Sequence, residues 1–214
     1  MSRIDHCQHQ GKSVLLVEGS DDCHVILALC QLFSIPENFG LYQCGGYTNL
    51  LKRLNALILQ ANGPEIIGIV VDADSQDIMS RWQQIKEKPE LKSYHFPHIP
   101  TPEGTVITGE NNKPKLGIWL MPDNKNPGML EDFLIDLAPQ DGIKAARNCV
   151  ANAQNQELTS FKEPHLSKAV IHTYLAWQDE PGKPLGQAVT AQVLQPSTQT
   201  AKAFIDWLKR LFNP

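Results

Sequence analysis

Three carboxylates in this sequence directly follow short apolar runs. Glu18 ends the run in SVLLVEG, and Asp72 and Asp74 end the run in IIGIVVDAD. Residues i and i+2 of an extended chain lie on the same face, so we expect Asp72 and Asp74 to point to one side. Oxygen ligands at this spacing suit Mg²⁺, which keeps several of its waters when it binds to proteins. The pattern therefore predicts a divalent-cation site that gathers Glu18, Asp72 and Asp74.

Three steps, each an apolar run followed by a helical pattern, carry these acids. Continuous apolar runs of this length are typical of buried parallel strands, and apolar residues recur at helical spacing after each of them. The expected strands are residues 13–17, 41–44 and 66–71, and the expected helices are residues 21–33, 48–61 and 76–88. Such steps favour an α/β fold with a mostly parallel, doubly wound sheet. Ligands of such sheets bind at the carboxyl ends of the strands, where the three acids are expected.

The alternation of strand and helix patterns ends after Pro89. The turn-rich segment GENNKP separates two strand-like segments, residues 105–108 and 115–121, which we expect to form a hairpin. From Gly128 onward the pattern is helical, at residues 128–137, 141–154, 164–177 and 200–212, with loops at PQDG and DEPGKPLG. We therefore predict an α/β core at residues 1–125 and a helical C-terminal extension at residues 126–214 that covers the core.

The composition indicates a globular protein. Of the 214 residues, 42% are hydrophobic and 20% are charged, which argues against disorder. No apolar run approaches the roughly 20 residues of a membrane span, and the N-terminus has no apolar signal core, so we expect a cytoplasmic protein without membrane contact. The net charge of −4 repels polyanions unless a local basic face or bound cations intervene. Five cysteines form no CxxC pair, and most are expected to be reduced, buried thiols.

The motifs LLVEGSDD and IVVDAD resemble those of the Toprim family, the catalytic fold of bacterial primases, type IA and type II topoisomerases, and nucleases of the overcoming-lysogenization-defect kind. The resemblance covers roughly residues 12 to 125. It implies that Glu18 acts in general acid or base chemistry and metal binding, and that Asp72 and Asp74 hold magnesium. Gly19 and Asp22 match the family's EG-x-x-D extension, and we expect both to contact substrate. The segment GMLEDFL and the tryptophan-bearing last helix also resemble a stand-alone Toprim-related family with no assigned function.

Further candidates lie outside these motifs. Glu131 and Asp132 could complete a two-metal site, but acids near helix starts are also common as caps, and Glu131 is the preferred ligand. Lys168 is a candidate to neutralise phosphate charge in a transition state, although one lysine on an amphipathic helix is usually solvated surface. Gly45 and Gly46 precede a helix and could bind a substrate phosphate or simply form a turn.

Together these features predict a Toprim-like protein that binds Mg²⁺ or Mn²⁺ and cleaves phosphodiesters in RNA or DNA. Its partner is then nucleic acid or a nucleotide phosphate, and the sequence leaves homo-oligomerisation open. Topoisomerase and primase activities are not expected, because no tyrosine-bearing gate domain fits and no Cys/His spacing matches a zinc module. Two alternatives are a non-catalytic or regulatory nucleic-acid or nucleotide-binding module that retains the acidic site, and a phosphotransfer enzyme with a small substrate.

Overall fold

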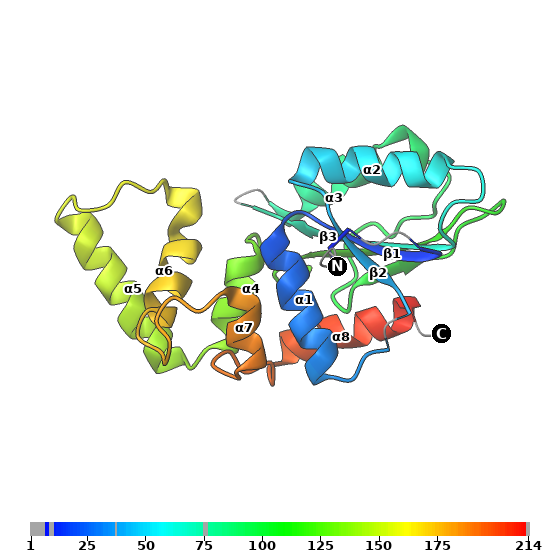
Figure 1. The fold of residues 1–214 in the computed structure, drawn as a ribbon. Coiled ribbons are helices and arrows are strands. Elements are labelled where there is room, and N and C mark those ends of the chain that lie inside the picture. Colours follow the sequence, from blue (N-terminus) through cyan, green and yellow to red (C-terminus); the bar gives the residue numbers. More distant parts are fainter. Residues whose placement is uncertain (1–6, 9–10, 37, 75–76, 213–214) are drawn as a thin grey trace.

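The computed structural model describes residues 7–8, 11–36, 38–74 and 77–212 and contains a five-stranded sheet with helices on both of its faces (Figure 1). The strand order is β2-β1-β3-β5-β4. Strands β2, β1, β3 and β5 run parallel, and β4 runs antiparallel to β5. The bounds are Ser13–Val17 for β1, Gly40–Gln43 for β2, Ile66–Asp72 for β3, Thr105–Ile107 for β4 and Lys115–Met121 for β5. The predicted α/β class, the mostly parallel sheet and the hairpin are therefore confirmed.

Helices α2 (Tyr47–Leu59) and α3 (Ile78–Lys86) cover one face of the sheet (Figure 1). Alternate strand residues point toward them, as expected for strands buried on both faces. Helix α3 begins after Asp77, whose carboxylate accepts the backbone N–H of Ser80 at 3.3 Å. The predicted helix start at Gln76 lies outside the described residues. The apolar layer on this face includes Val14, Leu16, Leu50, Leu54, Ile67, Ile69, Trp82 and Ile118.

Helices α1 (Ser20–Leu32), α4 (Leu130–Leu137) and α8 (Gln199–Phe212) contribute to the layer on the other face. Strand residues that point to this side, such as Leu15 and Trp119, are buried in the same cluster as the side chains of α8. A Cβ added at Gly117 would lie 2.3 Å from Leu211 Cδ2, so the helix packs directly on the sheet backbone. Because helices cover both faces, the sheet is doubly wound as predicted.

The remaining helices belong to the C-terminal third. Helices α5 (Gln140–Asn155) and α6 (Leu166–Leu175) form a pair that projects away from the sheet (Figure 1). Helix α7 (Leu185–Thr190) begins inside the segment predicted as a loop, and packs on α1 so closely that a Cβ at Gly186 would lie 2.7 Å from the His24 carbonyl oxygen. Short 3₁₀ helices occur at Pro89–Leu91 and Glu163–His165. No helix in the described part of the chain has the length and apolar character needed to cross a membrane. The division at residue 125 stays a prediction.

A disulfide joins Cys7 to Cys23 in the first turn of α1. The carbonyl oxygen of Cys7 also accepts the backbone N–H of Gln43 at 2.9 Å, so this segment lies against the end of β2. Of the other cysteines, Cys44 is half-buried and Cys149 is exposed. The bonded pair is buried as expected but not reduced, because the two cysteines are distant in sequence and meet only in the folded chain. The expected burial is wrong for Cys44 and Cys149.

Candidate functional site

Glu18 lies directly after β1, at the carboxyl edge of the sheet. Strands β1 and β3 are parallel neighbours, so their ends meet, and the backbone N–H of Asp72 donates to Glu18 Oε1 at 3.0 Å. Burial raises the pKa of Glu18, while the backbone N–H groups of Asp72 and Tyr47 and the positive charge of Arg81 oppose that rise. The predicted meeting of Glu18 and Asp72 at one edge of the sheet is confirmed.

Asp72 lies at the end of β3, among other acids. Burial raises the pKa of Asp72 to about 9, and the charges of Asp22, Glu18 and Glu131 add to the rise. The backbone N–H of Leu130, the first residue of α4, donates to Asp72 Oδ1 at 3.0 Å. A carboxyl group with this pKa keeps its proton at neutral pH unless a cation favours the charged form. The charge on Asp72 therefore depends on what the site binds.

Asp22 lies in the first turn of α1. Its Oδ2 accepts the backbone N–H of Gly19 at 3.0 Å, which is the capping contact that acids at this helix position commonly make. Burial raises the pKa of Asp22 to about 7, and the charges of Glu18 and Glu131 add to that rise. Asp22 therefore both caps α1 and adds negative potential around the ends of β1 and β3.

Helices α4 and α6 bring an acid and a base to the same region. Glu131 Oε1 lies 3.5 Å from Lys168 Nζ, and the two side chains are 8% and 51% exposed. The neighbouring acid, Asp132, accepts the backbone N–H of Met129 at 2.9 Å and so caps α4. The structure agrees with the capping interpretation of Asp132 and leaves Glu131 and Lys168 as the pair that reaches the site.

A cleft of about 330 Å³ connects these groups. Helices α1, α2 and α4 begin at its wall, after Gly19, Gly46 and Met129. Gly45 and Gly46 have φ angles of 73° and 107°, which glycine adopts at little cost, and they turn the chain from β2 into α2. Helix N-termini attract anions, so the cleft combines carboxylates with groups that favour phosphate. The predicted site residues that line it are Glu18, Gly19, Asp22, Gly45, Gly46, Asp72, Glu131 and Lys168.

Asp74 is the predicted site residue that the structure places beside this cleft rather than among its lining residues. Its φ angle is +57°, and its backbone N–H donates to the carbonyl oxygen of Gly128 at 2.8 Å. The Asp74 carboxylate forms an ion pair with Arg81 on α3. The extended conformation assumed for this segment therefore ends before Asp74, and the two aspartates do not share one side as predicted. The charge of Asp74 still raises the pKa values of Glu18 and Asp72.

The donor chemistry of the cleft fits a magnesium or manganese ion that is shared with a ligand. Glu18, Asp72 and Glu131 offer the oxygen ligands that these cations prefer. Among the residues that the structure describes, no three His, Cys, Asp or Glu side chains are arranged to hold one ion together. Magnesium commonly binds through one or two carboxylates and completes its shell with waters and substrate phosphates. The cleft therefore fits a cation bridged to a phosphate better than a closed protein cage.

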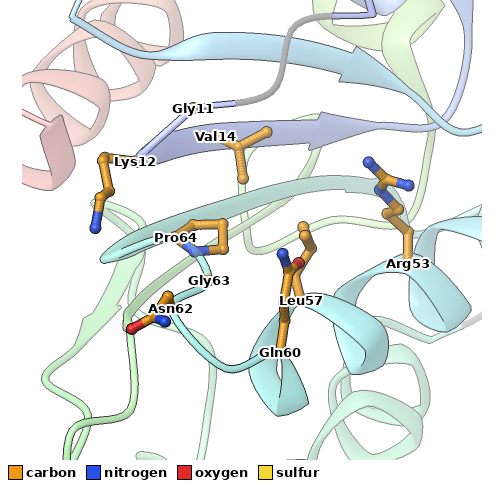
Figure 2. Close-up of a pocket in the computed structure, with 9 residues that line it drawn as sticks. All are labelled: Gly11, Lys12, Val14, Arg53, Leu57, Gln60, Asn62, Gly63 and Pro64. Atoms are coloured by element: carbon orange, nitrogen blue, oxygen red, sulfur yellow. The ribbon is translucent and has the colours of Figure 1, made fainter.

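A second cavity, of about 310 Å³, lies at the amino ends of β1 and β3 (Figure 2). Its two basic side chains, Lys12 and Arg53, lie at opposite ends of the cavity. Lys12 forms an ion pair with Glu65 at 3.2 Å, and Arg53 stacks over the Tyr42 ring at 4.2 Å. These polar groups do not converge on one point, so this cavity is a weaker candidate than the acidic cleft.

Comparison with known families covers nearly the whole chain. A model of the family described as "Protein of unknown function (DUF3226)" matches residues 12–213. The chain belongs to this family. The DUF3226 match includes the sheet and the C-terminal helices, so every residue that lines the acidic cleft lies within it.

A solved structure, the C-terminal region of the Xanthomonas campestris pv. campestris OLD protein, resembles this DUF3226 chain. The TM-score is 0.51 at 17% sequence identity, over 94% of this chain and 95% of that chain. At this identity the likeness concerns the fold alone. Among curated proteins, no sequence match to the DUF3226 chain was found.

Two parts of the candidate site were not predicted from the sequence: the Arg81 side chain and the backbone N–H groups at two helix starts. Arg81 lies in SRWQQIK, which has the pattern of an ordinary amphipathic helix, and its one available signal is its position seven residues after Asp74. The backbone N–H groups of Tyr47 and Leu130 have no side-chain signature, but the glycines before each helix were a usable sign of a helix start. The structure therefore adds the buried guanidinium group of Arg81 and two backbone N–H donors to the predicted acids.

Proposed function

We propose that this protein is a Toprim-like, metal-dependent enzyme that cleaves phosphodiester bonds in RNA or DNA at the acidic cleft. The observation that carries this proposal is the crowding of Glu18, Asp22, Asp72 and Glu131 at the starts of three helices. Crowded carboxylates repel one another unless a cation neutralises them, and helix N-termini favour phosphate. The similar fold of the C-terminal region of an OLD protein supports the proposal.

Each side chain of the cleft has a proposed role. Glu18, Asp72 and Glu131 are the proposed ligands of Mg²⁺ or Mn²⁺, which when bound supplies Lewis acidity to the water and the leaving oxygen. Glu18 has a raised pKa and is placed to move the proton of the attacking water. Lys168 lies beside Glu131 and is placed to offset the negative charge of the phosphate in the transition state.

The backbone of the cleft supplies the proposed contacts to substrate. Gly19, Gly45 and Gly46 lie at the starts of α1 and α2, where the absence of side chains leaves room for a phosphate to approach the helix N-termini. Asp22 holds the N–H of Gly19 and so orients the first turn of α1. The proposed ligand is a phosphate of the nucleic-acid backbone.

A bound cation would also offset the repulsion between this negatively charged protein and nucleic acid. The chain carries a net charge of −4, and four of its acids are crowded at the cleft, so a polyanion is repelled in the absence of metal. A divalent ion bridging the acids and a phosphate converts this repulsion into attraction. We therefore expect nucleic-acid binding to depend on the metal.

Cleavage of single-stranded, duplex and transfer RNA and of the matching DNA, with Mg²⁺, with Mn²⁺ and with chelator, tests the proposal. The expected result is metal-dependent cleavage that Asp72→Asn abolishes. Asp206→Asn is the matched control, because it removes the same charge from an exposed position on α8. Metal-dependent binding without cleavage would favour the non-catalytic module, and neither binding nor cleavage would overturn the proposal.

A further inference from the structure

Arg81 is a charged side chain inside the protein that the proposed reaction does not use. It lies on α3 and its side chain is 4% exposed. A buried guanidinium is costly unless it is paired. Its contacts come from three places: an ion pair with Asp74 after β3, the ring of Tyr47 at the start of α2 at 4.1 Å, and Gln84 Oε1 at 3.4 Å. Arg81 therefore ties the end of β3 to α2 and α3.

Asp74 is the anionic partner of this guanidinium. Among the described residues, Arg81 forms its one ion pair with Asp74, and its Nε makes no hydrogen bond to them. The backbone on the Asp74 side is also held, because the Asp74 N–H donates to Gly128, two residues before α4. The contact therefore directs the Asp74 carboxylate toward α3, although Asp72 lines the cleft two residues earlier.

The same guanidinium acts on the cleft through its charge. Arg81 lies close enough to Glu18 for its positive charge to stabilise that carboxylate, whereas Asp74 opposes ionisation of the same group. A positive charge at this position repels a cation that approaches Glu18, and it also neutralises a carboxylate that could attract or bind the cation. Both effects weaken cation binding.

We propose that Arg81 is a positioning residue that keeps Asp74 out of the acidic cleft and thereby weakens divalent-cation binding there. This inference rests on the proposed metal site. It assigns opposite effects to two neighbouring charges. Loss of Asp72 removes a metal ligand and should weaken cation binding, whereas loss of Arg81 frees the Asp74 carboxylate and should strengthen it. If Arg81 had a purely structural role, its loss would loosen the site and weaken cation binding.

Manganese affinity of the full chain, measured by calorimetry, tests this proposal. Arg81→Gln should bind Mn²⁺ roughly three- to tenfold more tightly than the wild type, which corresponds to about 1 kcal/mol, the size expected for one unit charge that is screened nearly as in bulk water. Circular dichroism confirms that the variant is folded. Arg147→Gln, an exposed position on α5, is the control and should bind as the wild type does. Equal or weaker binding by folded Arg81→Gln overturns the inference.

The double variant Asp74→Asn/Arg81→Gln covers the case in which Arg81→Gln does not fold. It removes both charges of the pair together, which avoids an unpaired buried charge. Because Asp74 does not bind the ion in the wild type and the double variant lacks both charges, the double variant should bind Mn²⁺ within about twofold of the wild type. A loss of more than about tenfold would show that Asp74 itself holds the ion, against the inference. Absence of Mn²⁺ binding by the wild type overturns the proposed function and this inference together.

Discussion

Substitution of Asp72 by asparagine should stabilise the metal-free protein at neutral pH. Burial and neighbouring acids raise the pKa of Asp72 from 3.8 to about 9. The folded protein keeps the proton on Asp72 while the unfolded chain loses it above about pH 4, so this group lowers the free energy of unfolding as the pH rises. Asparagine is neutral in both states, and its oxygen can still accept the N–H of Leu130.

The size of the effect follows from the interval over which the two states differ. Between pH 3.8 and pH 7 the interval is about 3.2 pH units, which at about 1.4 kcal/mol per unit corresponds to about 4 kcal/mol. Relaxation of the side chains and entry of water reduce this cost. We therefore expect Asp72→Asn to raise the free energy of unfolding by about 1–3 kcal/mol at pH 7, and to change it little near pH 4.

Urea unfolding in the presence of chelator, followed by circular dichroism at several pH values from about 4 to 8, measures this difference. The wild type should lose stability across that range more steeply than Asp72→Asn. The exposed Asp206→Asn variant should follow the wild type at every pH. If the Asp72→Asn and wild-type curves have the same pH dependence, or if the variant is the less stable protein at pH 7, the reasoning about buried charge at the end of β3 is refuted.

Further predictions concern the metal, the reaction and the packing of α8. Manganese should raise the Tm of the wild type and leave that of Asp72→Asn unchanged in a thermal melt; an equal rise in both would place the metal elsewhere. Glu18→Gln should lose turnover by more than it loses Mn²⁺ affinity, since it keeps an oxygen but cannot move a proton; steady-state rates and calorimetry separate the two, and unchanged turnover would contradict the role. Lys168→Met should slow cleavage without lowering the Tm, because the side chain is 51% exposed. Gly117→Ala should lower the free energy of unfolding by about 1–3 kcal/mol, because its Cβ meets Leu211; an unchanged urea midpoint would show that α8 can shift.

The sheet and the meeting of the acids could be predicted because they depend on local patterns. Apolar runs of the right length identified β1 and β3, and parallel pairing necessarily brings their carboxyl ends together. Glu18 and Asp72 therefore meet where the sequence indicated. The sequence likewise predicted a helix after the Gly45–Gly46 turn, and α2 begins at Tyr47, one residue before the expected start.

The rest of the site depends on contacts between distant segments, which no local pattern records. The direction of Asp74 is determined by Gly128 and Arg81, not by the alternation that governs β3. Helix α7 was not predicted, because it is short and lies in a segment rich in proline and glycine. It packs on α1, a contact between distant segments that has no local sequence pattern. The disulfide between Cys7 and Cys23 is a further long-range contact of this kind.

The close seating of α8 on the sheet has a consequence for how the chain folds during synthesis. Strands β3 and β5 leave the ribosome well before α8, which starts at Gln199. Until then the sheet face that carries Trp119, and the bare strip at Gly68 and Gly117, have no cover from this helix. Transiently exposed apolar surface of this kind is what chaperones bind and what leads to aggregation. We therefore expect the part of this sheet face that α8 covers to stay exposed until nearly the whole described chain has been made.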